Sequence, residues 1–229
     1  HKKEHGVFLF RDENTGVQYQ LPLIGPGKQI SSDNLAFPHC SGIFDWPVQK
    51  YLPVMMPELT FGDTVVVPSF YGKNCVTGVG LKKAFYLRFE QPDLIKTDGT
   101  FAHGLGSCQV QWSFGDGKVR SEFVFKVKNP VSMDKMRLAL VIGSPHSTYR
   151  LGTTLRQGQE GLRANVEVDD FQAKWGSFET VTEDPEYRGY AGNVHYIQYL
   201  VRDHPLNMRP GQQYKLVVSY HPDVAFADE

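Results

Sequence analysis

The sequence predicts an all-β protein in which two antiparallel sheets pack face to face as a sandwich. Aromatic residues make up 13% of the chain, together with 22 glycines and 14 prolines, and this mixture favours strands joined by turns over long helices. Many short segments also alternate polar and apolar residues, so several half-buried strands must cover one another's apolar faces. The 229 residues are compatible with one such domain.

Residues 1–62 differ from the remainder and are expected to form an extended N-terminal arm. Apolar runs at residues 7–10 and 17–24 precede a stretch in which prolines recur from Pro26 to Pro57. Proline removes a backbone donor and fixes φ, so this stretch is not expected to supply a long central strand. The sandwich is then expected to span residues 63–229.

Strand-like segments follow one another from Thr64 onwards. In residues 108–114 every even position is apolar or a thiol and every odd position is polar, which is typical of a strand with one buried face. Residues 115–117, Gly-Asp-Gly, can form a tight turn, and apolar alternation resumes from Val119 to Val127, so the pattern predicts a β-hairpin. The complete set of predicted strands is 64–71, 84–90, 107–114, 119–128, 136–142, 164–170, 177–182, 194–202 and 214–220.

Two features qualify this pattern. Residues 194–201 are apolar on both faces, which predicts a central strand or one that faces a partner subunit. Only short helices are expected, around residues 48–52 and 155–163, and Gly158 and Gly161 disfavour the second.

Charge and cysteine content exclude several classes of protein. The 24 Lys+Arg and 25 Asp+Glu give a net charge of -1, so no overall field attracts nucleic acid or an acidic membrane. No apolar run approaches the roughly 18 residues that a spanning helix needs. The three cysteines, Cys40, Cys75 and Cys108, cannot all pair and lack zinc-ligand spacing, so neither a disulfide framework nor a zinc site is expected, and a reducing compartment is the simpler assumption.

No catalytic, cofactor-binding or metal-binding residue is predicted, and the chain is not expected to be an enzyme. Ser144 and His146 lie in a Gly-Ser-Pro-His-Ser run whose proline is incompatible with a nucleophile turn. His39 and Cys40 are neighbours that would point to opposite faces of a strand. The eight histidines show no metal-binding spacing, and His195, within an apolar strand, is expected to be a buried structural imidazole.

Glycine-rich and acidic runs are better explained by turns than by sites. Residues 78–83 and 104–106 lack the following helix that would complete a phosphate site. The acidic pairs at 169–170 and 183–184 are expected at solvated strand ends.

The hairpin carries a small basic face. Lys118, Arg120, Lys126 and Lys128 could meet phosphate or an acidic protein, but the interleaved Glu122 favours a solubilising strand face.

Aromatic residues raise the possibility of stacking platforms for bases or sugars. Alternation places Trp112 on the same face as Val110 and Phe114, which predicts a core position instead. The other aromatic residues considered as platforms are Trp175, Tyr196, Tyr199 and Tyr214.

Strand patterns in the second half of the chain carry a family resemblance. In residues 121–130 an apolar strand runs into Asn-Pro, and in residues 135–145 the next strand ends at a loop containing Pro. These segments resemble the third and fourth strands of the jelly roll of picorna-like virus coat proteins. Residues 211–226 are similar to the last strand and exit segment of the small coat protein of plant comoviruses and related secovirids, and residues 166–182 to its sixth and seventh strands.

The resemblance, over about residues 107–229, implies that residues 63–229 form a jelly-roll sandwich and that the chain is a capsid protein. Such a protein assembles with copies or sister subunits into a small icosahedral virion around an RNA genome. The implied partners are other capsid subunits and, weakly, genomic RNA, without membrane or cofactor, and the implied locations are the virion and the host cytoplasm. Coat proteins of this family are released from a polyprotein, which would explain a chain that begins at His1.

Two alternatives stay open. A carbohydrate- or ligand-binding β-sandwich module would need exposed aromatic residues around a groove. A jelly-roll hydrolase would need two facing carboxylates, for which Glu167 and Glu179 are the candidate pair.

Overall fold

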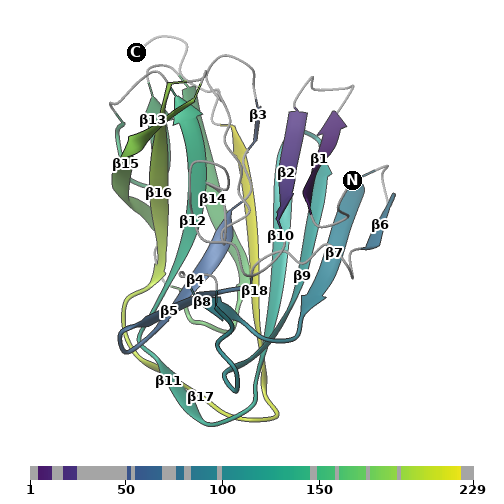
Figure 1. The fold of residues 1–229 in the computed structure, drawn as a ribbon, viewed down its shortest axis with the longest axis vertical. Helices are drawn as coiled ribbons and strands as arrows, with labels where there is room; N and C mark the ends of the chain where they lie inside the picture. Colours follow the sequence, from purple (N-terminus) through teal and green to yellow (C-terminus); the bar gives the residue numbers. More distant parts are fainter. Residues whose placement is uncertain are drawn as a thin grey trace.

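Two antiparallel sheets packed face to face form the body of the protein, which confirms the predicted all-β sandwich (Figure 1). The computed structural model describes residues 5–11, 18–24, 51–52, 55–68, 76–79, 84–96, 100–144, 149–157, 160–173, 176–189 and 192–222. The chain passes repeatedly from one sheet to the other, as in Greek-key and jelly-roll sandwiches.

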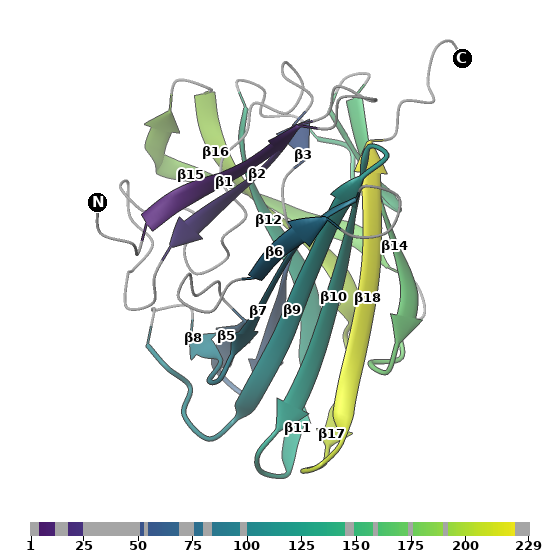
Figure 2. The same ribbon diagram turned by 90° about the vertical axis from the view of Figure 1, so that its right-hand side faces the viewer.

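The front sheet faces the viewer in Figure 2 and has seven strands in the order β13-β14-β18-β10-β9-β7-β6. Their bounds are β13 Thr154–Gln157, β14 Glu160–Asp169, β18 Gln213–Pro222, β10 Lys118–Val127, β9 Gly106–Gly115, β7 Phe85–Gln91 and β6 Val76–Val79.

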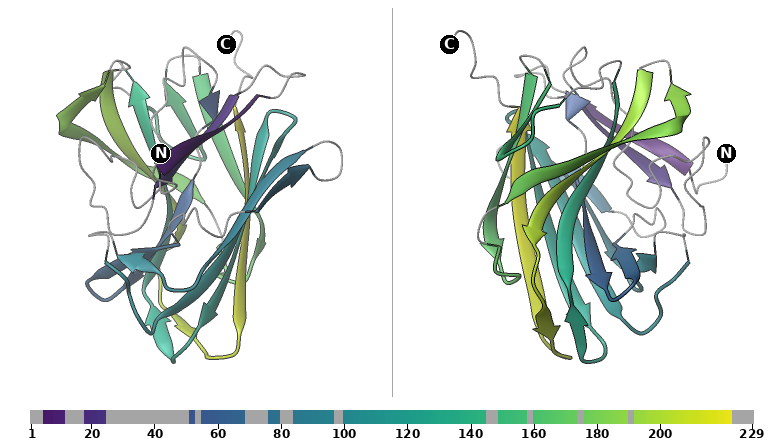
Figure 3. Two further views of the ribbon diagram at one scale, coloured as in Figure 1. Left: turned by 45° about the vertical axis from the view of Figure 1, so that its right-hand side comes forward. Right: turned by 90° about the vertical axis from the view of Figure 1, so that its left-hand side faces the viewer.

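The back sheet has six strands in the order β15-β16-β12-β4-β5-β8. Their bounds are β15 Ser177–Gly189, β16 Gly192–Arg202, β12 Lys135–Ser144, β4 Met56–Phe61, β5 Thr64–Val67 and β8 Ile95–Lys96. A two-stranded ribbon of β11, Val131–Met133, and β17, Leu206–Met208, lies at one end of the sandwich (Figure 3).

The predicted hairpin is confirmed as β9 and β10. Phe114 pairs with Val119 and Val110 with Phe123, so the apolar residues of both strands share one face. The turn uses positive φ at Asp116 (52°) and Gly117 (69°), the conformation that a type I′ hairpin turn requires.

The core lies between the inner faces of the sheets and is strongly aromatic. Its largest fully buried side chains are Trp112, Tyr220, Phe114, Phe123, Phe125 and Phe171. Phe125 and Phe171 meet edge to face with ring centroids 5.5 Å apart, a favoured aromatic geometry. Each such side chain stabilises the fold by about 1.5–3 kcal/mol through burial.

The prediction of a short helix at residues 155–163 is wrong. Strands β13 and β14 pair there in antiparallel register, with Leu155 opposite Leu162. Both leucines are buried, so period-two burial against the core decides the local structure where helix propensity was weak. Of residues 48–52, Tyr51 and Leu52 form strand β3, which pairs in parallel with β2, and residues 48–50 lie outside the described part.

Part of the segment that was expected to be an arm belongs to the sandwich. Strand β4 pairs along β12 from Met56 to Thr60, although it contains Pro57. Pairing of β4 with β5 begins only at Leu59, so the missing N–H of Pro57 breaks no ladder bond on that side. Residues His5–Arg11 (β1) and Gln18–Ile24 (β2) form a separate small sheet with β3 (Figure 2).

No helix in the described part of the chain has the length and apolar character needed to span a membrane.

Candidate ligand-binding groove

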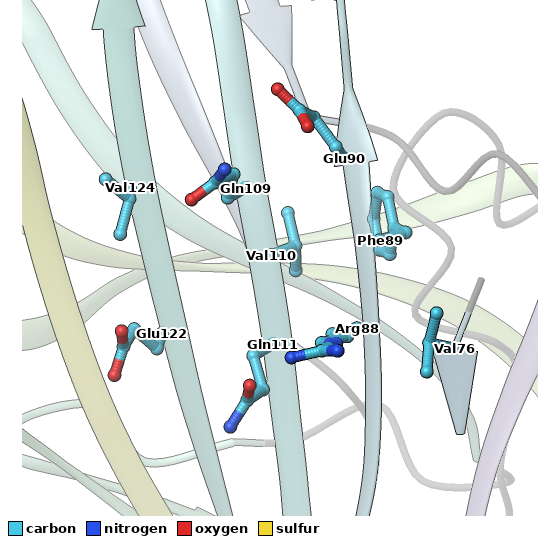
Figure 4. A pocket seen from close by; sticks show the side chains of 9 residues that line it. All are labelled: Val76, Arg88, Phe89, Glu90, Gln109, Val110, Gln111, Glu122 and Val124. Atoms are coloured by element: carbon cyan, nitrogen blue, oxygen red, sulfur yellow. The ribbon is translucent and has the colours of Figure 1, made fainter. Parts of the chain in front are cut away.

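The outer face of the front sheet contains a groove of about 340 Å³ that crosses strands β6, β7, β9 and β10. Figure 4 shows its side chains in two rows that follow the strand register. One row joins Arg88, Gln111 and Glu122, and the other joins Glu90, Gln109 and Val124. The complete lining is Val76, Arg88, Phe89, Glu90, Gln109, Val110, Gln111, Glu122 and Val124.

Strand alternation produces this arrangement. On β7 the buried Leu87 and Phe89 alternate with the exposed Arg88 and Glu90, so the apolar residues enter the core and the polar residues face outward. Three successive antiparallel strands repeat this pattern, and their polar positions therefore meet on one surface.

The groove combines donors and acceptors of both kinds. Gln109 and Gln111 each offer an amide oxygen and two N–H donors, Arg88 offers a guanidinium, and Glu90 and Glu122 offer carboxylates. Among the described residues, the side chains of Glu90, Gln109 and Gln111 form no hydrogen bond or ion pair with one another or with other described side chains. No described side chain therefore uses their bonding capacity, which a ligand could use instead.

The β10 side of the groove is fixed by ion pairs. Glu122 lies 3.0 Å from Lys215 Nζ and 3.5 Å from Arg120. Arg120 Nε also lies 3.2 Å from Glu167, which accepts a 2.6 Å hydrogen bond from Ser219 Oγ. Of the basic face predicted for the hairpin, Arg120 is thus paired with carboxylates, and Lys128 forms an ion pair with Asp93.

A second cavity, of about 590 Å³, lies along β14 and the turn that follows it. Tyr199 and Ala164 line it, and the Tyr199 hydroxyl donates to the Ala164 carbonyl at 3.4 Å. The Asp169 carboxylate accepts hydrogen bonds from the backbone N–H groups of Phe171 and Ala173, while burial raises the pKa of Asp169. This carboxylate therefore shapes the turn, and its bonding capacity is largely used by the backbone.

The outer face of the back sheet carries a polar cluster that satisfies itself. Glu58 is only 5% exposed and accepts hydrogen bonds from Tyr196 Oη and, at 2.8 Å, from Gln198 Nε2. Arg137 forms an ion pair with Glu179. Burial, and then the neighbouring Glu58 carboxylate, raise the pKa of Tyr196 well above its usual value.

The described histidines and Ser144 lie at separate places in the fold. His195 is buried, as predicted, and its Nδ1 lies 2.7 Å from Tyr149 Oη. The exposed His103 lies 3.5 Å from Asp93, and within the described ranges no group of three or more His, Cys, Asp or Glu could hold a metal ion. Ser144 ends β12, whereas residues 145–147, His39 and Cys40 lie outside the described residues.

The glycine-rich and acidic runs occupy strands and turns. Residues 78–79 belong to β6, and Gly104 accepts a 3.0 Å bond from Asn129 in the turn before β9. Residues 183–184 lie within β15, so their predicted place at a strand end is wrong, whereas residues 169–170 lie at the end of β14, where Asp170 accepts a 3.0 Å bond from the backbone N–H of Lys215.

None of the described aromatic residues considered as platforms lines the groove. Trp112 is fully buried, as predicted, and Tyr199 and Tyr214 are also buried. Tyr196 lies in the back-sheet cluster, and Trp175 is outside the described residues.

Glu167 and Glu179 do not face one another. Glu167 is bonded to Arg120 on the front sheet, whereas Glu179 is bonded to Arg137 on the back sheet. The pair therefore lacks the opposed arrangement that glycoside hydrolysis requires.

Sequence reasoning missed Arg88, Glu90, Gln109 and Gln111 as a group. The alternation of Gln109 and Gln111 with core residues predicts a strand, but by itself it does not indicate a binding site. The signal that could have found the site is the pairing of residues 84–90 with residues 107–114, which brings their polar positions together.

No family model matches this sequence, and no curated protein matches it. Among solved structures, a heparinase III with methylated lysines is similar to it with a TM-score of 0.46 and 13% identity, over 99% of this chain and 35% of that one. A putative kojibiose phosphorylase from the human microbiome gives a TM-score of 0.28 and 5% identity, over 98% of this chain and 27% of that one. The chain thus spans about a third or less of each of these structures, and its function has to be inferred from its own side chains.

Proposed function

We propose that the protein is a glycan-binding β-sandwich module whose ligand lies in the groove on the front sheet. The observation that carries this proposal is the set of Arg88, Glu90, Gln109 and Gln111, which gather in one groove with their bonding capacity uncommitted to other described polar side chains. A polar surface that is not satisfied internally can exchange water for a ligand at little desolvation cost.

The chemistry of the groove favours an uncharged, hydroxyl-rich ligand. A primary amide presents a donor and an acceptor side by side, which matches two neighbouring hydroxyl groups. Arginine and glutamate alternate in the groove, so it lacks the uniform positive charge that phosphate or nucleic acid would need. The lining side chains come from neighbouring strands of one sheet, so an extended chain could lie across them (Figure 4).

Binding of neutral oligosaccharides to the purified chain, measured by isothermal titration calorimetry, tests the proposal. Gln109→Ala and Gln111→Ala should each weaken binding about tenfold, the equivalent of about 1.4 kcal/mol for the lost hydrogen bonds. Gln213→Ala is the matched control, because Gln213 is an exposed glutamine in the same sheet but outside the groove. Failure of the wild type to bind any oligosaccharide, or an equal loss in Gln213→Ala, would refute the proposal.

A shell subunit of a picorna-like virion remains a second proposal, supported by the strand and punctuation pattern of residues 107–229. Its partners would be copies or sister subunits, with weak RNA contact, in the virion and the host cytoplasm. Light scattering on the purified chain distinguishes the two proposals: closed particles support a shell subunit, and a glycan-binding monomer supports the module. The large exposed apolar side chains of the described part are Val76, Val79, Phe101, Leu151 and Val168.

A further inference from the structure

A tyrosine ring lies flat on the sheet next to the groove. Tyr86 shares the outward face of β7 with Arg88, and directly opposite it on β6 is Gly78. A Cβ atom at Gly78 would lie 2.6 Å from Tyr86 Oη, 2.7 Å from Cζ and 2.9 Å from Cε1. The phenol ring therefore covers the position that any side chain at residue 78 would occupy.

Two neighbours hold the ring in this place. The guanidinium carbon of Arg88 is 6.0 Å from the centroid of the Tyr86 ring, a distance at which cation–π attraction operates. Gly78 lies beneath the ring, and because Tyr86 is half-buried, part of the ring remains open to solvent. Arg88 and Val76 also line the groove, so the ring extends the groove along the edge strand.

We propose that the Tyr86 ring is a stacking platform for the apolar face of a pyranose ring of the ligand, an inference that rests on the proposed glycan-binding function. A pyranose with equatorial hydroxyl groups has C–H groups on its ring faces and polar groups around its rim. Arg88 lies over this ring in the free protein, so it has to move aside for the sugar face to pack on the electron-rich face of tyrosine; Arg88 and the groove amides then meet the rim of the sugar. The ligand class is therefore a chain of pyranoses with mainly equatorial hydroxyl groups, such as a β-linked gluco- or xylo-oligosaccharide.

A purely structural role for Tyr86 makes a different prediction. An aromatic residue that covers a glycine on a neighbouring strand can stabilise a sheet edge without any ligand. In that case a change at Tyr86 would alter the unfolding midpoint but not the affinity of the folded protein. Affinity measured well below the unfolding transition of every variant separates the two roles.

The test measures dissociation constants for cellohexaose, xylohexaose and mannohexaose by titration calorimetry. Tyr86→Ala should weaken the best of them about tenfold, whereas Tyr86→Phe, which keeps the ring, should stay within about twofold of wild type. Gly78→Ala should also weaken binding, because its methyl group displaces the ring. Phe101→Ala, which removes an exposed aromatic side chain outside the groove lining, should bind as wild type does.

The outcomes separate the platform from the groove. If Gln109→Ala loses affinity but Tyr86→Ala does not, the platform is refuted and the glycan-binding groove stands. If Tyr86→Phe loses as much as Tyr86→Ala, the hydroxyl rather than the ring face binds, and stacking is refuted. If the wild type binds no hexaose, glycan binding by the groove fails, and the platform fails with it.

Discussion

Replacing Gly106 with alanine tests how tightly β9 and β10 approach one another. Gly106 has φ +155°, a conformation that residues with a side chain rarely adopt. A Cβ atom there would lie 2.2 Å from the carbonyl oxygen of Lys126 and 3.0 Å from Val127 Cα, whereas ordinary contact begins at 3.4 Å. Both contacts are backbone atoms of the paired strand β10, so no side chain can rotate away to relieve the overlap.

The expected cost can be built from its parts. An unfavourable backbone conformation costs about 1–3 kcal/mol, and overpacking adds about 1–3 kcal/mol. Loss of a strand hydrogen bond adds about 1 kcal/mol. The sum predicts that Gly106→Ala lowers the free energy of unfolding by about 3–7 kcal/mol, a large share of the roughly 5–15 kcal/mol that a domain has.

Three other glycines supply matched controls. Gly62 (φ +55°) and Gly211 (φ +80°) have positive φ but nothing within 4 Å of an added Cβ, so alanine there should cost only about 1–2 kcal/mol. Gly152 has open space without a positive φ, and Gly152→Ala should change stability by less than about 0.5 kcal/mol. Urea unfolding followed by tryptophan fluorescence gives the midpoint and slope for each variant. A Gly106→Ala protein as stable as Gly211→Ala would refute the close approach of the two strands.

Three further outcomes are expected. Tyr196→Phe removes the hydrogen bond that Tyr196 donates to the buried Glu58 carboxylate, and should lower the free energy of unfolding in urea by about 1.5–3 kcal/mol; no measurable loss would contradict this bond. Lys128 Nζ donates a 3.0 Å hydrogen bond to Asp93 and lowers the pKa of Asp93 below its usual value of 3.8. The stability that this pair adds is therefore fully present above about pH 3.8 and is lost as the pH falls through the lowered pKa of Asp93. Because the pair is partly exposed, the effect should stay below about 1 kcal/mol; NMR titration should show the Asp93 pKa returning towards 3.8 in Lys128→Ala, and an unchanged pKa would count against the pair. Trp112→Ala empties a fully buried site and should cost about 3–5 kcal/mol, so a urea midpoint close to that of the wild type would exclude a core position.

Period-two alternation was sufficient to predict the strands with one buried face. The predicted residues 107–114 and 119–128 correspond to β9, Gly106–Gly115, and β10, Lys118–Val127, with ends that differ by one residue. Here the inward residues are mostly apolar, with the buried Ser121 as an exception, and the turn residues Asp116 and Gly117 tolerate positive φ, so local and tertiary preferences agree.

Strands whose burial comes from distant partners could not be predicted in the same way. Because proline lacks an N–H donor, Pro57 argues against a strand at residues 56–61. Strand β4 nevertheless pairs with β12 there, and because its pairing with β5 begins only at Leu59, no hydrogen bond to β5 is lost at Pro57. Strand β6 is too short to show a period, and two of its residues, Val76 and Val79, are exposed. The groove depends on such non-local pairing, because Val76 lies opposite Arg88 only once β6 joins β7.

The apolar appearance of residues 194–201 also had a cause that the sequence did not show. It predicted a central strand covered on both faces or one that faces a partner subunit. Strand β16 does lie inside its sheet, between β15 and β12, and Tyr196, Gln198 and Leu200 on its outer face are half-buried. Tyr196 turns its hydroxyl to Glu58, so it acts there as a polar residue with an apolar body.

Both outer faces of the sandwich carry glutamine and glutamate side chains, but these side chains differ in whether they are already hydrogen-bonded. On the back sheet, Glu58 is bonded by Tyr196 and Gln198, so a ligand would have to break bonds that already exist. On the front sheet, Gln109 and Gln111 occupy positions where their described neighbours leave the amide groups unbonded. A polar group that is already satisfied contributes mainly to stability, whereas one that bonds only water can bond a ligand for a similar enthalpy. This difference, and not the number of polar residues on either face, is why we propose the front sheet as the binding face.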